Sequence, residues 1–231
     1  MEVHWAAFGA LEQAVRTGRP AFDQVTGVQG FDYFTAHPEE GALFDQAMAA
    51  KASGQIGPVL KAYDFSSFAR IGDIGGGQGH LLRAVLSRAP EASGVLLDLP
   101  AVAARAAPHD RIQIIGGDFF SDQMPVCDLY LMMSVLHDWA DDEAAAILAN
   151  LRRAAPPQAR LLLIEAVLAP PGGGRDDYDM ARMIDIEMLV MTHGRERTRA
   201  EWAAVLSDGG WRLERVLPAG PWSGIIEAAP A

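Results

Sequence analysis

Residues 73–82 read DIGGGQGHLL, where an apolar run ends in a cluster of glycines and a helical pattern begins. Glycine lets the backbone turn tightly and approach a ligand closely, and the amino terminus of a helix favours negative groups. The stretch therefore predicts a strand, a tight loop and a helix. The loop alone leaves two interpretations open, a ligand-binding turn or a purely structural one.

Short apolar runs continue beyond this loop. GVLLDLP, RIQIIGGDFF, CDLYLMMSVL and ARLLLIEAVL alternate with helical stretches such as DDEAAAILANLRRAA. Such alternation indicates a parallel sheet with helices on both faces. WRLERVLPAG and WSGIIEAAP instead read as two strands joined by a short turn, which adds an antiparallel pair at the end of the sheet. We therefore expect a doubly wound, mostly parallel α/β sheet of seven strands.

The first part of the chain has a different pattern. AAFGALEQAV has helical spacing, RTGRPAFDQVTGVQG interrupts it with glycine and proline, and PEEGALFDQAMAAKASGQIGPVLKAYDF resumes it. One face of this last segment carries four apolar residues, Leu43, Phe44, Ala47 and Met48. We expect N-terminal helices over residues 1–65 and the α/β domain over residues 66–231. APPGGGRDDYD (169–179) is interpreted as a flexible loop.

The charge and cysteine content disfavour several classes of protein. The chain has 19 basic and 30 acidic residues, so its formal net charge is −11. A phosphate backbone would be repelled, which disfavours nucleic acid as a partner. The single cysteine, Cys127, allows no intramolecular disulfide and favours a reducing compartment. The start lacks the layout of a signal peptide, and no apolar run approaches the ~20 residues that span a bilayer. We expect a cytoplasmic protein without a membrane partner.

Carboxylates stand at the ends of the next two predicted strands. Asp98 ends GVLLD, where it could accept both hydroxyls of a ribose, and Asp118 precedes Phe119, which could flank an adenine. Each has a structural alternative, because Asp98 could cap a helix and Asp118 could stand in a turn. The ends of parallel strands meet at one edge of the sheet, so with Asp73 they suggest an adenosine-containing ligand. His80 stands where the dinucleotide fingerprint requires glycine, which disfavours a nicotinamide-linked dehydrogenase.

Five motifs in order, DIGGGQG, LLDLPAV, GDFF, LHDW and GRERT, resemble the S-adenosylmethionine-dependent O-methyltransferases of the caffeate and hydroxyindole type. Bacterial members of that family methylate polyketides and other aromatic natural products. The resemblance implies a class I, Rossmann-like methyltransferase fold, with S-adenosylmethionine as cofactor and S-adenosylhomocysteine as product. It places Gly75 near the methionine part, Asp98 at the ribose, and Asp118 with Phe119 around the adenine. The full predicted cofactor site is Asp73, Gly75, Gly77, Asp98, Asp118, Phe119 and Ser134.

His137 follows the apolar run LMMSVL at the same edge of the predicted sheet. A phenol with a pKa of ~10 is a poor nucleophile while protonated, and an imidazole with a pKa of ~6.5 can take its proton during attack. The resemblance implies that His137 is the general base for methyl transfer to a hydroxyl, expected to be phenolic. It assigns Glu165 and Glu196 as the carboxylates that orient the imidazole.

Asp138 is interpreted as a helix cap in preference to a catalytic residue, which is the alternative. With Asp141, Asp142 and Glu143 it precedes the helical stretch EAAAILANL, and acidic side chains favour a helix amino terminus. The remaining histidines lack metal-ligand spacing such as His-Glu-x-x-His, and the family resembled uses no metal. We therefore expect no metal.

MARMIDIEMLVM (180–191) is expected to form a helix that by resemblance lines the acceptor pocket. Methionines either pack in a core or form adaptable walls for flat aromatic ligands. The predicted acceptor-site residues are Phe44, Met48, Trp139 and Met183. Residues 1–65 are therefore expected to be a helical remnant or linker that also forms part of the acceptor pocket. Trp139 fits a core position equally well.

The chain departs from the family pattern at two places. Family members carry a longer amino-terminal region that builds a homodimer, and this chain begins near the end of that region. It is interpreted as a truncated form, a fragment or a naturally short homologue, which leaves dimerisation open. Met133 occupies a position where plant members often have a lysine in contact with the cofactor. Two alternative functions also stay open: a cofactor-binding relative that supports hydroxylation or decarboxylation, and a non-catalytic partner subunit.

Overall fold

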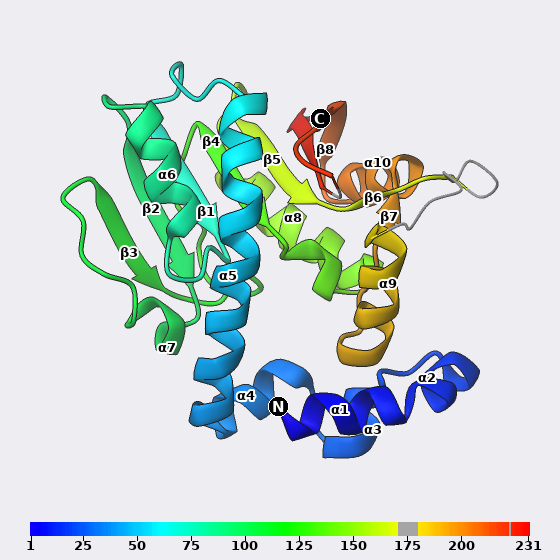
Figure 1. Ribbon diagram of the computed structural model, residues 1–231. Helices are drawn as coiled ribbons and strands as arrows, with labels where there is room; N and C mark the ends of the chain where they lie inside the picture. Colours follow the sequence, from blue (N-terminus) through cyan, green and yellow to red (C-terminus); the bar gives the residue numbers. More distant parts are fainter. Residues whose placement is uncertain (171–179, 222) are drawn as a thin grey trace.

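The computed structural model describes residues 1–170, 180–221 and 223–231 (Figure 1). At its centre is a seven-stranded sheet with the strand order β3-β2-β1-β4-β5-β9-β8. The strands are β1 (Arg70–Ile74), β2 (Ser93–Asp98), β3 (Ile112–Gly116), β4 (Leu129–Met133), β5 (Arg160–Glu165), β8 (Trp211–Pro218) and β9 (Gly224–Pro230). Strands β1 to β5 run parallel, whereas β9 is antiparallel to both β5 and β8. The predicted fold class is confirmed, including the antiparallel pair at the end of the sheet.

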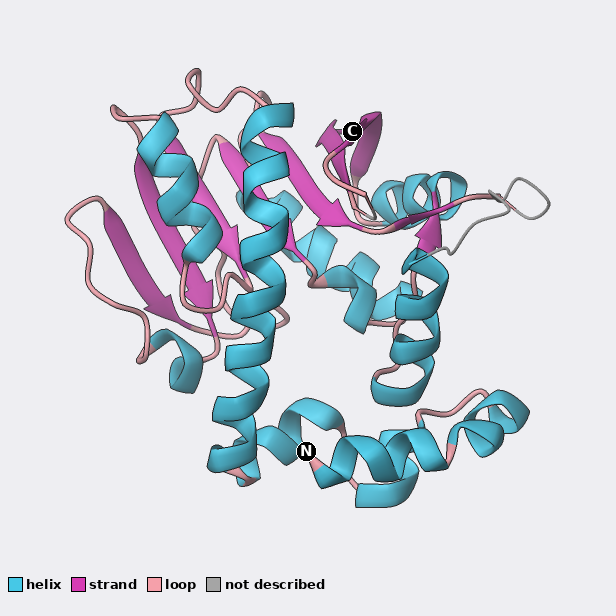
Figure 2. Cartoon of the chain, viewed as in Figure 1, coloured by secondary structure: helices cyan, strands magenta, loops and turns pink. Residues whose placement is uncertain are grey.

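Helices cover both faces of the sheet (Figure 2). Successive side chains of a strand point to opposite faces, so each inner strand contributes to two cores. Leu96 and Leu131 belong to a core shared with α5 (Pro38–Ala62) and α6 (His80–Arg88). Their neighbours Leu97 and Tyr130 belong to the core on the other face, shared with α8 (Asp141–Ala154) and α10 (Arg199–Asp208). Burial on both faces explains why these strands read as continuous apolar runs.

Four short helices precede α5: α1 (Glu2–Gly9), α2 (Leu11–Thr17), α3 (Ala21–Thr26) and α4 (Gly30–Ala36). They lie beside α9 (Met180–Met191), and Phe22 and Val190 belong to the small third core between them (Figure 1). The stretch AAFGALEQAV does not form one helix, because α1 and α2 are separated at Ala10. Helix α3 lies inside the predicted interruption, since Pro20 and Gly27 mark the two ends of a helix there instead of a loop.

The apolar face predicted on α5 is not a core face. Leu43 is 51% exposed and Met48 is 37% exposed, whereas Gln55 and Val59, further along the helix, are buried. The helical periodicity therefore predicted the helix correctly, but it did not predict which of its faces is buried.

Short elements join the sheet to the rest of the molecule. They are α7 (Pro100–Ala103), the 3-10 turn η1 (Leu136–Asp138), β6 (Val167–Leu168) and β7 (Arg197–Thr198). Strands β6 and β7 pair in parallel and bring the GRERT segment beside the end of β5. Most of the predicted flexible loop, residues 171–179, lies outside the described residues. In the described ranges, no helix is long and apolar enough to cross a membrane.

Candidate active site

The glycine loop follows β1, at the edge of the sheet where the parallel strands end. This edge faces α4 and the lower end of α5 (Figures 1 and 2). Gly75, Gly77 and Gly79 have φ values of 67°, 60° and 77°, a left-handed backbone that strains other residues. The N–H of Gly75 donates to the carbonyl of Leu97 at 2.8 Å, which ties the loop to β2. A Cβ on Gly77 would meet no atom of the described residues within 4 Å, so the backbone there is open to a ligand.

Two predicted cofactor carboxylates border this loop. Asp98 accepts hydrogen bonds from the N–H groups of Gly77 at 2.7 Å and Leu99 at 2.8 Å, and burial raises its pKa. Asp73 is 1% exposed, its Oδ2 has no hydrogen-bond partner among the described residues, and burial raises its pKa to about 7. Asp98 thus shapes the loop directly, and Asp73 offers an unsatisfied oxygen beneath it.

Asp118 and Phe119 follow β3. Asp118 accepts from the N–H of Phe120 at 2.9 Å and from the hydroxyl of Ser121 at 3.0 Å, so the turn role considered for it is present. The ring of Phe119 reaches the glycine loop, because a Cβ on Gly75 would lie 3.6 Å from its Cε1. An aromatic face, an open glycine backbone and an unsatisfied carboxylate oxygen are together compatible with an adenosine-type cofactor.

Ser134, the last predicted cofactor residue, has an unusual backbone. Its φ of 53° is the one left-handed value among the described non-glycine residues, and its N–H donates to the carbonyl of Ile164 at 3.0 Å. Such strain concentrates at functional sites and persists only where the surroundings impose it. It turns the chain sharply from β4 into η1, which carries His137.

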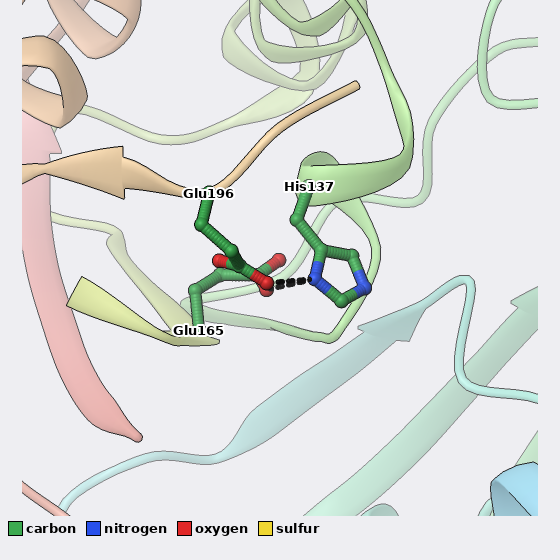
Figure 3. Close-up of side chains that lie close together, drawn as sticks. All are labelled: His137, Glu165 and Glu196. Carbon is green, nitrogen blue, oxygen red and sulfur yellow. Dashed lines mark hydrogen bonds and ion pairs between the residues drawn. The ribbon is translucent and has the colours of Figure 1, made fainter. Parts of the chain in front are cut away.

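His137, Glu165 and Glu196 meet at this turn (Figure 3). Nδ1 of His137 lies 2.7 Å from Oε1 of Glu196 and 3.7 Å from Oε2 of Glu165. All three side chains are at most 5% exposed. The other ring nitrogen, Nε2, points away from both glutamates (Figure 3). The structure therefore brings together the three residues predicted as the catalytic group.

Unbalanced negative charge surrounds the imidazole. Burial alone would lower the pKa of His137, but the nearby carboxylates, Glu165 foremost, outweigh burial and raise it to about 9. Burial also raises the pKa of Glu165, whose Oε1 accepts the N–H groups of Val135 and Leu136, both at 3.0 Å. Oε2 of Glu165 and Oε2 of Glu196 have no hydrogen-bond partner in the described part of the chain. The group favours a proton on the imidazole once one arrives there.

The prediction that Asp138 caps the following helix is wrong. Helix α8 begins at Asp141 after Ala140, and Glu143 accepts the N–H of Ala140 at 3.1 Å. Asp138 belongs to η1, and its Oδ1 lies 3.7 Å from Nε2 of His137. The extra turn between β4 and α8 places Asp138 beside the imidazole, and burial raises its pKa.

The predicted acceptor residues do not all gather at one place. Trp139 stacks on Phe31 of α4, with ring centres 5.8 Å apart, and meets Phe119 edge-on at the same distance. Phe44 stacks on Phe34 with ring centres 4.6 Å apart. Met48 and Met183 are 37% and 48% exposed. Trp139 therefore lies between the cofactor region and the N-terminal helices.

Sequence reasoning missed Phe31 and Arg197. Phe31 lies in a segment without a motif, so nothing in the sequence connected it to Trp139. Arg197 belongs to the GRERT motif, but the sequence did not predict that its side chain is buried, with 0% exposure. A further finding is that ligand atoms of His137, Glu165 and Glu196 lie within 4.8 Å of one another, a spacing that would also fit a metal ion.

Similarity to known proteins identifies the family of this chain. A family model described as an O-methyltransferase domain matches residues 8–212. Phenazine O-methyltransferase PhzM of Lysobacter antibioticus is 38% identical over 99% of this chain and 68% of that protein. The solved structure of LaPhzM has a TM-score of 0.94 at 38% identity, covering 100% of this chain and 70% of that one. NcsB1 from neocarzinostatin biosynthesis, solved with S-adenosyl-L-homocysteine and 1,4-dihydroxy-2-naphthoic acid, has a TM-score of 0.88 at 29% identity, covering 99% and 69%. The chain thus spans about two thirds of the length of these relatives.

Proposed function

Because this chain belongs to the S-adenosylmethionine-dependent O-methyltransferase family, we propose that it methylates a phenolic hydroxyl of an aromatic or polyketide-type small molecule, with His137 as general base. Relatives bind or modify small aromatic compounds, as the dihydroxynaphthoic acid bound to NcsB1 illustrates.

The hydrogen bond between His137 and Glu196 is the observation that carries this proposal. When Nδ1–H donates to the carboxylate at 2.7 Å, the neutral imidazole keeps its lone pair on Nε2. Nε2 can then accept the proton of a hydroxyl as that oxygen attacks. Glu196 and Glu165 stabilise the imidazolium that forms, as a carboxylate does in other imidazole bases.

We propose that the glycine loop with Asp73, Asp98, Asp118, Phe119 and Ser134 holds the cofactor. Bound there, S-adenosylmethionine would supply a methyl group carried on a sulfonium, with the neutral thioether S-adenosylhomocysteine as the leaving group. The chain's own residues then have to orient the acceptor, remove its proton and exclude water. Burial of the His137 group supports the exclusion of water.

The acceptor is proposed to lie against Trp139 and Phe31, with Met183, Met48 and Phe44 as more distant walls. Stacked aromatic rings offer a flat apolar surface to a flat aromatic ligand. Phe31 comes from residues 1–65, which supports the interpretation that this segment forms part of the acceptor site and not only a linker to the α/β domain.

The first test is titration calorimetry with S-adenosylhomocysteine, followed by assays with S-adenosylmethionine and a panel of phenols, naphthols and hydroxyquinones. Saturable micromolar binding and a methyl ether identified by mass spectrometry are expected. Cofactor binding with a hydroxylated or decarboxylated product, and no methyl ether, would contradict O-methylation and favour the non-methylating alternative.

We further propose that transfer needs no metal, although the His137 group has a spacing that would fit one. Nδ1 and Oε1 of Glu196 are at hydrogen-bond distance, which fits a shared proton. Dialysis against EDTA should leave the turnover rate unchanged. A loss that added Mg²⁺ or Zn²⁺ restores would assign the cluster to a metal instead.

A further inference from the structure

Arg197 is a charged side chain with 0% exposure, next in sequence to Glu196. A buried charge is costly unless paired and hydrogen-bonded throughout. Arg197 is fully engaged: Nε donates to Oδ1 of Asp141 at 2.8 Å, and the guanidinium lies 4.9 Å from the ring centre of Trp202. One terminal nitrogen also lies 2.8 Å from Oδ1 of Asp141, and the other donates to the carbonyl of Arg195 at 3.4 Å. Both terminal nitrogens in addition reach the turn that carries His137.

The two terminal nitrogens of Arg197 donate to backbone carbonyls on both sides of His137. One terminal nitrogen donates to the carbonyl of Leu136 at 3.0 Å, and the other donates to the carbonyl of Trp139 at 2.8 Å. Inside η1 the hydrogen bonds are long, at 3.2 Å from Asp138 to Val135 and 3.4 Å from Trp139 to Leu136. So short and loosely bonded a turn depends on outside partners for its orientation.

The partners of the turn divide by charge. Glu165 accepts its N–H groups at Val135 and Leu136, and Arg197 donates to its carbonyls at Leu136 and Trp139. A carboxylate thus holds the N–H groups of this turn, and a guanidinium holds its carbonyls.

The segment before β7 also presses directly on this turn. A Cβ on Gly194 would collide with the carbonyl oxygen of His137 and with the backbone of Asp138 and Trp139. Two residues later, Glu196 holds the imidazole itself. Residues 194, 196 and 197 therefore contact the turn at its backbone, its ring and its flanking carbonyls.

We propose that Arg197 is a positioning residue that sets the orientation of His137 through the carbonyls of Leu136 and Trp139. The inference rests on the proposed role of His137 as base. A planar guanidinium can serve Asp141 and both carbonyls at once, whereas a lysine ammonium on a flexible stem cannot reproduce that fork. Arg197→Lys should therefore keep the charge and lose the geometry.

A matched control lies two residues away. Arg195 donates to the other oxygen of the same aspartate, Asp141, at 2.8 Å. It also donates to Glu201 at 2.6 Å, and its side chain is 44% exposed. We expect Arg195→Lys to keep the turnover rate within about twofold, and Arg197→Lys to lower kcat by about tenfold or more with the Kd for S-adenosylhomocysteine nearly unchanged. Equal kcat values for the two variants would overturn the proposal.

The pH profile separates positioning from a merely structural role. The charged groups facing His137 are Glu165, Glu196 and Asp138, and Lys51 and Glu187 act on Asp138. Loosening the contact with Glu196 weakens the stabilisation of the imidazolium, so the acidic limb of kcat should move to lower pH in Arg197→Lys. A lower kcat with an unmoved limb would indicate only partial unfolding and would overturn the proposal.

A double variant tests whether Arg197 acts through His137. In the His137→Ala background, Arg197→Lys should cause no further loss of rate, because the positioned group is gone. An additional, undiminished loss would show that Arg197 acts by another route.

If His137→Ala alone kept the wild-type rate, the proposed function of His137 would fail. An Arg197→Lys enzyme with the wild-type rate would instead overturn only the role of Arg197. Should Arg197→Lys not fold, Asp141→Asn, at an exposed partner of Arg197, should move the limb in the same direction; an unmoved limb would overturn the proposal.

Discussion

The glycine loop and the His137 turn lie at the same edge of the sheet and are built in different ways. The loop owes its shape to backbone conformation and to one nearby strand end, since Gly77 and Asp98 are 21 positions apart. The turn is held by side chains from distant segments, with 59 positions between His137 and Glu196 and 61 between Leu136 and Arg197. Changes in the loop should therefore affect folding and cofactor binding, and changes around the turn should affect rate.

His137→Ala gives the largest expected separation between the two regions. Loss of a positioned general base lowers kcat by about 10²–10⁴. Because the turn is distinct from the glycine loop, the Kd for S-adenosylhomocysteine should stay the same in calorimetry. His37→Ala, at an exposed histidine before α5, is the matched control and should leave both values unchanged. An equally active His137→Ala enzyme would remove His137 from the mechanism.

Glu196→Gln should have the next largest effect, because it removes a negative charge and keeps the shape of the side chain. The carboxylates raise the pKa of His137 to about 9, so the base is deprotonated, and kcat/KM increases, as pH rises toward that value. Removing one negative charge lowers this pKa, which moves the acidic limb of kcat/KM to lower pH. We expect kcat to fall by about 10- to 10²-fold, because the imidazolium formed in transfer loses a charged partner. A limb at the wild-type pH would contradict the coupling seen in the structure.

The same contrast explains what the sequence could predict. Strand–helix alternation and the glycines of residues 75–79 are local patterns, so the sheet and the loop followed from them. His137 was identified because its motif follows a strand and a recognisable loop. The position of Asp138 was not, since an acid before a helix looks like a cap until the extra turn η1 is seen. Burial of Arg197 depends on the pairing of β6 with β7, two-residue strands with no periodicity to detect.

Gly76→Ala tests the loop side of the comparison. A Cβ at this position would lie 2.7 Å from Cδ1 of Leu96 and closer still to the side chain of Asp73, both of which are buried. Overpacking of this kind costs about 1–3 kcal/mol of unfolding free energy. Gly57→Ala is the control, because its Cβ would meet no described atom within 4 Å and alanine favours a helix. Urea denaturation should show a loss for Gly76→Ala and none for Gly57→Ala; equal stabilities would mean that the loop tolerates side chains.

Met183→Ala should have the smallest effect, confined to the acceptor. Met183 stands one helical turn before Glu187 on α9, and Glu187 is close enough to Asp138 to help raise its pKa. Met183 is one of the proposed acceptor-site residues, and its side chain is 48% exposed, so a ligand can reach it. Truncation of Met183 should remove about 1 kcal/mol of apolar contact with an aromatic acceptor. The KM for that acceptor should therefore rise by about fivefold, with kcat and the free energy of unfolding little changed. Val126→Ala, 57% exposed just before β4 at the opposite edge of the sheet, should leave KM unchanged. Equal KM values for the two variants would place the acceptor away from α9 and confine it to the side of Trp139 and Phe31.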